Sequence, residues 1–555
     1  MKSFPLLFAL GGALGLLAPL GSAQLPAPPA PPGNPVTTEK ALLGKALFWD
    51  EQLSSTGTVS CGTCHMPEAG GSDPRSRITA LSRHPGADGL FHTADDGRGS
   101  PGVPRHLADG HWQRDPLFGF HAQVTGRKAP SVIGTGYSQQ LFWDGRAGQV
   151  LRDPITDEVV LSEGAALETQ VLAPPVSAVE MGHVDRTWEE VVARIVEARP
   201  LDLSEELPAE LERWIAERDY PALFQEAFGT PEVSATRIAM AIATYERTLV
   251  PDQTPWDRVL AGEPVDQVLT GPEIQGLLTF LDPEVSGCVD CHSSDPATTR
   301  LTDDRFHFIG VRPRDEDVGR FGVTEHTPDT GKFRTPGLRN VELRAPYMHN
   351  GSQKRLRDVV DFYDRGGDFD APNKHPSIRP LNLTEHSRRS LIAFLGRPLT
   401  DPRVAQGLPP FDRPSQYADS ARVPEVFGEA TAGSGGVAPE IYAVEPPRLG
   451  QPRLTVALEA ALGGAPAFLL MNTQDVPGGV LRQGARLYPG LAGSFLRCVP
   501  KLEGVGIGAG WGSLVLPVPE DASWLGTELY AQWVVLDRGS AGGLAASPAL
   551  RIAWY

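Results

Sequence analysis

The 555-residue chain has only five cysteines, too few for a disulfide-stapled scaffold. Basic residues are also in the minority, since 50 Lys and Arg stand against 68 Asp and Glu and the formal net charge is −18. Such an acidic chain is a poor candidate for binding nucleic acid, because neutralising phosphates requires clustered Lys and Arg. Gly and Pro are numerous, with 60 and 52 residues, but below the share that marks a wholly disordered chain.

Long uncharged apolar runs are missing beyond the N-terminus, so we expect no stable membrane span. At 1–23, Lys2 precedes an apolar run at 6–20, and the small residues at 21–23 match a cleavage site. This pattern predicts a signal peptide and a periplasmic or otherwise exported protein. A membrane anchor is the alternative, but the run is short for one.

The mature chain divides by composition. Residues 24–36 are Pro-rich and predict an extended, semi-rigid tether. Helical spacing of apolar residues dominates residues 37–400, and residues 401–440 have the Pro, Gly and Ala content of a linker. Short apolar runs separated by Gly and Pro at 441–555 predict a small all-β, sandwich-like domain with a packing or docking role. Its Cys498 is expected to be a buried small residue, with a reactive thiol as the alternative.

Two capping boxes predict helix starts within the helical part, Thr187 with Glu190 and Thr270 with Glu273. Apolar residues at helical spacing follow each of them. The stretch 66–127 differs, because it is rich in Gly, Asp, Arg and His and has no sustained period. It predicts a long functional loop.

Four of the five cysteines lie in two copies of the C-x-x-C-H pattern, the attachment signature of c-type haem. The two thiols form thioethers with the haem, and the adjacent histidine binds the iron. Zinc sites and thioredoxin-like dithiols are the alternatives. Zinc needs clustered ligands, whereas these pairs are 227 positions apart, and a dithiol does not require the trailing histidine. We therefore predict two covalently bound haem c groups, held by Cys61, Cys64 and His65 and by Cys288, Cys291 and His292.

Two haems predict two haem domains, at 37–250 and 251–400. The fold expected is mainly α, with two c-type cytochrome-like domains followed by the all-β domain. Over about residues 40–400, the chain resembles the bacterial di-haem cytochrome c peroxidase and MauG family. Besides the two haem motifs, the matching segments include Leu141-Phe-Trp-Asp-Gly-Arg146, Val179-Glu-Met181, Tyr245-Glu-Arg-Thr-Leu249, Phe333-Arg-Thr-Pro-Gly-Leu-Arg-Asn340, Ala345-Pro-Tyr-Met-His-Asn-Gly351 and Asp361-Phe-Tyr-Asp-Arg365.

The resemblance implies that peroxide reacts at the His65 haem, while the His292 haem receives and stores electrons. Glu180 matches the family's distal acid, and Gln170 matches its partner. A carboxylate suits this chemistry, because it takes a proton from one peroxide oxygen and delivers it to the leaving one. A solvated surface acid is the alternative for Glu180.

Two further positions match residues near the haems. Trp143 corresponds to the tryptophan between them, where it can carry an electron or a hole, and Arg334 corresponds to a basic position close by. Taken alone, Trp143 is also consistent with a core aromatic residue, and Arg334 with a surface salt bridge.

The resemblance assigns the sixth ligand of the second haem by its distance in sequence from the histidine of one matching segment. In the family a methionine falls fourteen positions after the histidine of the Pro-Tyr-x-His segment. From His349 this count reaches Tyr363, as in MauG-type members, and Met348 is the alternative. A phenolate stabilises ferric and higher states, whereas a thioether favours ferrous iron. Tyr363 is also consistent with a core aromatic.

The sequence departs from the family pattern at the inter-haem calcium site. The asparagine ligand is replaced by Lys128, while Arg344 and Pro346 would supply the carbonyl ligands. We expect the ammonium to point at those carbonyls in place of the ion; alternatively, Lys128 turns to solvent and a weakened calcium site remains. The loop that caps the peroxidatic iron in many members is longer here. Its candidate histidines are His84, His92, His106, His111 and His121.

Together these features predict an exported di-haem peroxidase that reduces hydrogen peroxide with electrons from a small soluble redox protein, a cytochrome c or a cupredoxin. Two other functions stay open. One is a MauG-type enzyme that oxidises side chains of a partner protein, and the other is a non-enzymatic electron carrier with two six-coordinate haems. Homodimer formation is also left open.

Overall fold

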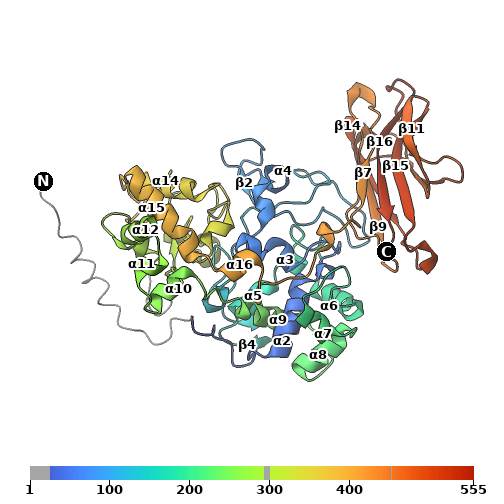
Figure 1. Ribbon diagram of the computed structural model, residues 1–555. Helices are drawn as coiled ribbons and strands as arrows, with labels where there is room; N and C mark the ends of the chain where they lie inside the picture. The colour runs from blue at the N-terminus through green and yellow to red at the C-terminus, as the bar shows by residue number, and fades with distance from the viewer. Residues whose placement is uncertain (1–24, 293–299, 452) are drawn as a thin grey trace, which may run out of the picture.

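Helices come first along the chain and strands last, as the colours of Figure 1 show from blue to red. The computed structural model describes residues 25–292, 300–451 and 453–555. The expected signal peptide at 1–23 lies outside them. Within the described residues, no helix is both long enough and apolar enough to cross a membrane. The order of a helical part and a C-terminal β-rich part is confirmed.

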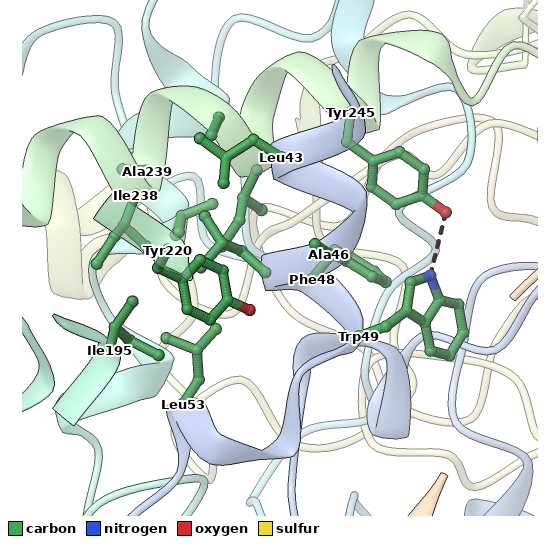
Figure 2. Close-up of a cluster of buried hydrophobic side chains, with 14 of the residues drawn as sticks. Leu43, Ala46, Phe48, Trp49, Leu53, Ile195, Tyr220, Ile238, Ala239 and Tyr245 are labelled. Carbon is green, nitrogen blue, oxygen red and sulfur yellow. Dashed lines mark hydrogen bonds between the residues drawn. The ribbon is translucent and has the colours of Figure 1, made fainter. Parts of the chain in front are cut away.

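The first helical core is built on α2 (Thr38–Trp49) and α9 (Ala235–Thr248). The two helices touch at Gly44, where a Cβ would come 1.9 Å from the Ala241 carbonyl oxygen. Trp49 Nε1 donates a hydrogen bond of 3.2 Å to the Tyr245 hydroxyl (Figure 2). Helices α6 (Trp188–Glu197) and α8 (Tyr220–Phe228) complete this core.

The second helical core combines α12 (Gly271–Leu281), α14 (Leu356–Asp364) and α15 (Glu385–Leu395). Both predicted capping boxes are present, at the N-termini of α6 and α12. The shorter helices are α3 (Cys61–Cys64), α4 (Thr79–Ser82), α5 (Ala166–Val171), α7 (Ala209–Ile215), α10 (Pro255–Leu260), α11 (Val265–Val268), α13 (Phe321–Thr324) and α16 (Pro402–Gln406).

The Pro-rich segment is anchored to the first core over its described residues, 25–36. Leu25 is buried, and the buried Asn34 side chain donates a 2.8 Å hydrogen bond to Glu168. Arg247 donates to the carbonyl of Pro29. The segment has no regular secondary structure and turns at residues 32–34, and it packs on the protein.

Residues 401–440 also differ from the expected linker. Val404 and Phe411 are fully buried in the first core, and Gln416 donates hydrogen bonds to the hydroxyls of Ser60 and Thr63. A strand at the end of this segment, β7 (Glu425–Phe427), belongs to the C-terminal sheet. Composition suggested a linker because Pro and Gly are frequent, but the few large apolar side chains decide the packing. The β-rich region therefore begins before residue 441.

This β region contains a five-stranded antiparallel sheet in the order β13-β10-β15-β16-β7 and a three-stranded one in the order β14-β9-β8. One apolar core, which includes Leu454 and Trp533, takes side chains from both sheets. The strands are β8 (Glu440–Tyr442), β9 (Leu454–Gly463), β10 (Ala467–Asn472), β11 (Asp475–Arg482), β12 (Ala485–Pro489), β13 (Phe495–Val499), β14 (Gly506–Leu516), β15 (Glu528–Leu536) and β16 (Leu544–Ala553).

Cys498 is exposed, so its predicted burial is wrong. It lies on β13, which forms an edge of the five-stranded sheet and is exposed over most of its length. The long loop at 66–127 holds only short elements, among them α4 and a hairpin of β1 (Arg83–His84) and β2 (Gly97–Arg98). Other short pairs are β3 (Leu151–Arg152) with β4 (Val159–Leu161) and β5 (Phe306–His307) with β6 (Phe333–Arg334).

Candidate functional site

The first C-x-x-C-H motif forms a single helical turn. Cys61 and Cys64 are the ends of α3, and the glycine between them packs on Trp49 so closely that a Cβ would lie 2.2 Å from the ring. His65 follows as the C-cap, and its Nδ1 donates to the backbone carbonyl of Gly71 at 3.1 Å. This bond leaves Nε2 as the nitrogen with a free lone pair. Burial lowers the pKa of His65 and so favours the neutral ring that a metal requires.

The two cysteines of the first motif are half-buried, and neither forms a disulfide. Burial raises the pKa of both, and that of Cys64 reaches about 12. Zinc would need thiolates and further ligands. In the described part of the chain, neither Cys61, Cys64 nor His65 belongs to a group of three or more metal-ligating side chains. The zinc alternative therefore has no support at this motif.

The second motif lines a cavity of about 240 Å³. Cys288, Cys291 and His292 share its wall with Arg300 and side chains of the second core. His292 repeats the arrangement of the first motif, because its Nδ1 donates to the Leu301 carbonyl at 3.0 Å. Burial again lowers the pKa of the histidine. Both motifs thus present a neutral imidazole with a free Nε2.

Both candidate sixth ligands line this cavity. Tyr363 lies in α14, and burial together with the nearby thiols of Cys291 and Cys288 raises its pKa. Met348 lies outside the regular elements, in the left-handed region with φ of 71°. The cavity therefore accommodates either ligand, and the assignment to Tyr363 stays a prediction.

Trp143 lines the same cavity. Its Nε1 donates a 2.8 Å hydrogen bond to the carbonyl of Lys128, and its own carbonyl accepts from the backbone of Arg334 at 2.8 Å. The His349 ring lies 6.4 Å from Trp143 and stacks on Phe333 at 3.7 Å. These contacts hold the tryptophan rigidly beside the cavity.

Arg334 is held inside the protein rather than on its surface. Its side chain is 10% exposed and bonds to Asp304 at 3.1 Å and to Ser138 at 3.0 Å. Burial lowers its pKa, and Asp304 opposes that change. The alternative of a surface salt bridge is therefore wrong, although an ion pair is present.

Lys128 adopts neither of the two orientations predicted for it. The residue is 5% exposed, and its ammonium donates to the Ser72 hydroxyl and, at 3.2 Å, to the Ala129 carbonyl. It is not aimed at the carbonyls of Arg344 and Pro346, and it does not face solvent. Burial, reinforced by the Arg344 guanidinium, lowers the pKa of Lys128 to about 7. The sequence did not indicate that the Ser72 hydroxyl and the Ala129 carbonyl would be the partners of the ammonium.

Glu180 lies in the turn after a short 3₁₀ segment, with its backbone N–H bonded to the Ser177 carbonyl at 3.1 Å. Burial raises the pKa of its carboxyl, while the Ser177 hydroxyl and the Arg146 charge oppose the rise. The Glu180 carboxylate also contributes to the raised pKa of Cys61 and Cys64, which places it close to the first motif. Gln170 is half-buried near the end of α5, and no hydrogen bond joins its side chain to Glu180 in the described chain.

The loop histidines have different surroundings. His106 is buried, its Nδ1 donates to the Pro104 carbonyl at 2.7 Å, and its Nε2 lies 2.9 Å from the Ser55 hydroxyl. With both nitrogens engaged, it is unsuited to cap an iron. The others are held by a hydrogen bond, an ion pair or a ring contact: His84 with Gly86, His92 with Arg83, His111 with Asp109 and His121 with Tyr442.

Arg186 is a site residue that the sequence did not reveal. It is 6% exposed, and one nitrogen donates to the carbonyls of Leu53, Pro175 and Met181 at 2.7, 2.9 and 3.3 Å. Burial lowers its pKa to about 9. It ties together the backbone on both sides of Glu180. An arginine just before a helix N-cap carries no periodic signal that would mark it as buried.

Each of the two helical cores carries a C-x-x-C-H motif whose half-buried histidine has a free Nε2, the arrangement expected of a protein with two haems. The profile of the di-haem cytochrome c peroxidase family matches residues 38–265. The chain is 30% identical over 373 residues to the methylamine utilization protein MauG of Methylorubrum extorquens, covering 66% of this chain and 80% of that protein. It is also 30% identical over 419 residues to the cytochrome-c peroxidase IdrP1 of Denitromonas iodatirespirans, covering 70% and 88%.

A solved MauG-like protein associated with microbial copper homeostasis aligns with a TM-score of 0.49 and 28% identity, over 70% of this chain and 96% of that one. The sequence relatives show the family. The chain belongs to the di-haem cytochrome c peroxidase and MauG family, and it is an oxidoreductase that acts on peroxide.

The family implies haem, and the residues present fit it. Each motif offers two thiols and a free Nε2 on one local segment. At the second motif, the Arg300 Nε is buried and has no hydrogen-bond partner among the described residues. With Arg334 on the same cavity wall, it supplies donors suited to haem carboxylates. The two motifs would therefore hold one haem each.

If both motifs attach haem covalently, the denatured protein retains two haems, because thioether bonds survive unfolding. The intact mass should equal that of the mature polypeptide plus two haems. The variant Cys61→Ala/Cys64→Ala should lose one haem, whereas Cys498→Ala, at the exposed cysteine, should keep both. A wild-type mass with one haem or none contradicts the assignment.

If Tyr363 is the sixth ligand of the second haem, Tyr363→Phe should alter the absorption and electron paramagnetic resonance spectra of that haem alone. Met348→Leu should leave them unchanged, because it conserves volume without offering the required ligand. The opposite pattern, a change with Met348→Leu and none with Tyr363→Phe, would show that methionine ligates the iron.

Peroxidase activity should survive treatment with a calcium chelator, because a buried lysine stands where the family has a calcium ligand and its nitrogen is not the oxygen donor that calcium requires. Lys128→Asn restores the family's oxygen donor, so this variant should become sensitive to the chelator and recover with added calcium. Loss of wild-type activity on chelation, restored by calcium, would show that Lys128 does not replace the ion.

Proposed function

We propose that the protein is an exported peroxidase that reduces hydrogen peroxide to water at the His65 site, with electrons from a small soluble redox protein such as a cytochrome c or a cupredoxin. The observation that carries this proposal is Glu180, a carboxyl of raised pKa next to the first motif. An electron carrier needs no acid–base group at its iron, whereas peroxide cleavage does.

When bound, the haem at His65 supplies the iron that binds peroxide and accepts the oxidising equivalents. Glu180 is the group that moves the proton. Its raised pKa brings the two protonation states closer in free energy, which suits a group that takes a proton from one oxygen and returns it to the other. Ser177 and Arg186 hold the backbone around it, so that the carboxyl keeps one position.

Electrons would enter at the His292 site and pass Trp143 to the first site. The indole is fixed by its hydrogen bond to the Lys128 carbonyl, and the Lys128 side chain reaches Ser72 and Ala129 near the first motif. Hydrogen bonds of Lys128 thus connect Trp143, in the wall of the second cavity, with Ser72, close to His65. Rigid aromatic placement suits transfer of an electron or a hole.

A second candidate function is MauG-type oxidation of a partner protein's side chains. Tyr363 at the counted ligand position favours it, because a phenolate stabilises the higher oxidation states that such an oxidant stores. Steady-state turnover separates the two. Rapid oxidation of a reduced cytochrome or cupredoxin by peroxide supports the peroxidase, and slow turnover of every donor supports the second function.

Glu180→Gln keeps the size of the side chain but removes its titrating group. We expect the rate constant for reaction with peroxide to fall by roughly 10²-fold or more, the scale of general acid–base catalysis. The wild-type rate should fall as pH drops through the pKa of Glu180, above the ordinary value near 4.5; the variant should lack this dependence.

The matched control is Glu163→Gln, which changes an exposed glutamate and should leave the rate unchanged. Stopped-flow mixing with peroxide measures both variants. Equal rates for wild type and Glu180→Gln reject the role of this carboxyl.

A further inference from the structure

The β region is attached to the long loop by a buried tryptophan. Trp112 is 1% exposed and packs with Phe120 of the loop and Ala457 of β9. Its Nε1 donates to the Glu445 carboxylate at 3.1 Å, and its backbone N–H donates to the Ser513 hydroxyl of β14 at 3.0 Å. An indole from the loop therefore fills a site built by the β region.

Neighbouring contacts extend this attachment. The hydroxyl of Thr455, on β9, donates to the Gly110 carbonyl at 2.9 Å, and Arg453 donates to the Ala108 carbonyl. Glu445 is buried, and burial raises its pKa, while its contacts with Trp112 and the Thr455 backbone oppose the rise. In Figure 1 the blue loop segments after α3 reach the side of the β region that carries β9.

The other side of this loop is bonded to the segment that carries Glu180. The His106 carbonyl accepts from the backbone of Val184 at 2.9 Å, and the Gln123 side chain donates to the Ala178 carbonyl at 2.7 Å. Val103 donates to the Val179 carbonyl at 3.3 Å. These bonds lie on both sides of Glu180.

A short path joins the two sets of contacts. His106 pairs with Trp112 across a β-bridge, and its Nε2 lies 2.9 Å from the Ser55 hydroxyl. The backbone N–H of Ser55 donates to the Met181 carbonyl at 2.8 Å, directly after Glu180. Burial lowers the pKa of His106 to about 4, so at neutral pH its Nε2 accepts a hydrogen bond from the Ser55 hydroxyl.

We propose that the β region serves the peroxide reaction by holding Glu180 in place, with Trp112 as the positioning residue through which it acts. This inference rests on the role proposed for Glu180. Trp112 touches no reacting atom; it fixes the loop, and the loop fixes the backbone on both sides of the carboxyl. Displacing a catalytic group by about 1 Å costs on the order of 10²-fold in rate, so a remote anchor has a measurable effect.

The test uses the full-length protein with both haems. Trp112→Ala should lower the rate constant for reaction with peroxide by about 10-fold or more, on the scale of a misplaced catalytic group. Haem content and the spectrum of the His292 haem should stay unchanged. Trp112→Phe keeps an aromatic ring but loses the Nε1 donor, so it should recover part of the rate. Trp524→Ala changes a tryptophan of the β region that packs on Trp554, and it should leave the rate unchanged.

A double variant separates positioning from general destabilisation. If Trp112 acts through Glu180, Trp112→Ala should cost little in the Glu180→Gln background, because the group it positions no longer titrates. The same fold-loss in both backgrounds, or an equal effect of Trp524→Ala, overturns the inference. Should Trp112→Ala fail to load two haems, Trp112→Phe and Thr455→Val, which removes the hydroxyl bound to Gly110, replace it in the same comparison.

The two proposals fail in different ways. If Glu180→Gln reacts with peroxide at the wild-type rate, the role of Glu180 itself is wrong. If Glu180→Gln is slow but Trp112→Ala, Trp112→Phe and Thr455→Val all react at the wild-type rate, only the positioning role is wrong.

Discussion

In each C-x-x-C-H motif, the candidate iron ligand is a histidine tied through Nδ1 to a backbone carbonyl a few residues further along the chain. His65 bonds to Gly71 and His292 to Leu301. This single bond fixes the tautomer and the ring orientation, and it leaves Nε2 aimed away from the backbone. Each motif depends on a different apolar core for its support. The two imidazole positions are independent of each other, which fits the two haems that the family implies.

Three basic side chains, Lys128, Arg334 and Arg344, line the cavity at the second motif. Burial lowers the pKa of Lys128, Arg334 and Arg344, and of these only Arg334 has a carboxylate partner, Asp304, among the described ion pairs. Buried cations are costly unless anions or hydrogen bonds compensate them. Haem carboxylates are anions of the required kind, so the interior is electrostatically suited to the groups the family implies.

Local patterns predicted local structure well. The capping boxes at Thr187 and Thr270 start helices, and the apolar run that ends at Leu536 is the strand β15. The assignments of the haem motifs and of Glu180 rest on short matching segments and stay predictions. What failed depended on contacts distant in sequence. Lys128 found Ser72 as a partner 56 positions away, and Cys498 is exposed because its strand lies at a sheet edge. No periodic pattern encodes such placements.

The segment after the second core completes the first one. Val404 and Phe411 fill its interior, and Gln416 bonds to Ser60 and Thr63, the residues that cap α3. During synthesis, the chain therefore presents the first motif long before the residues that close over it have emerged. The N-terminal core reaches its final packing only after the region around the second motif has been made.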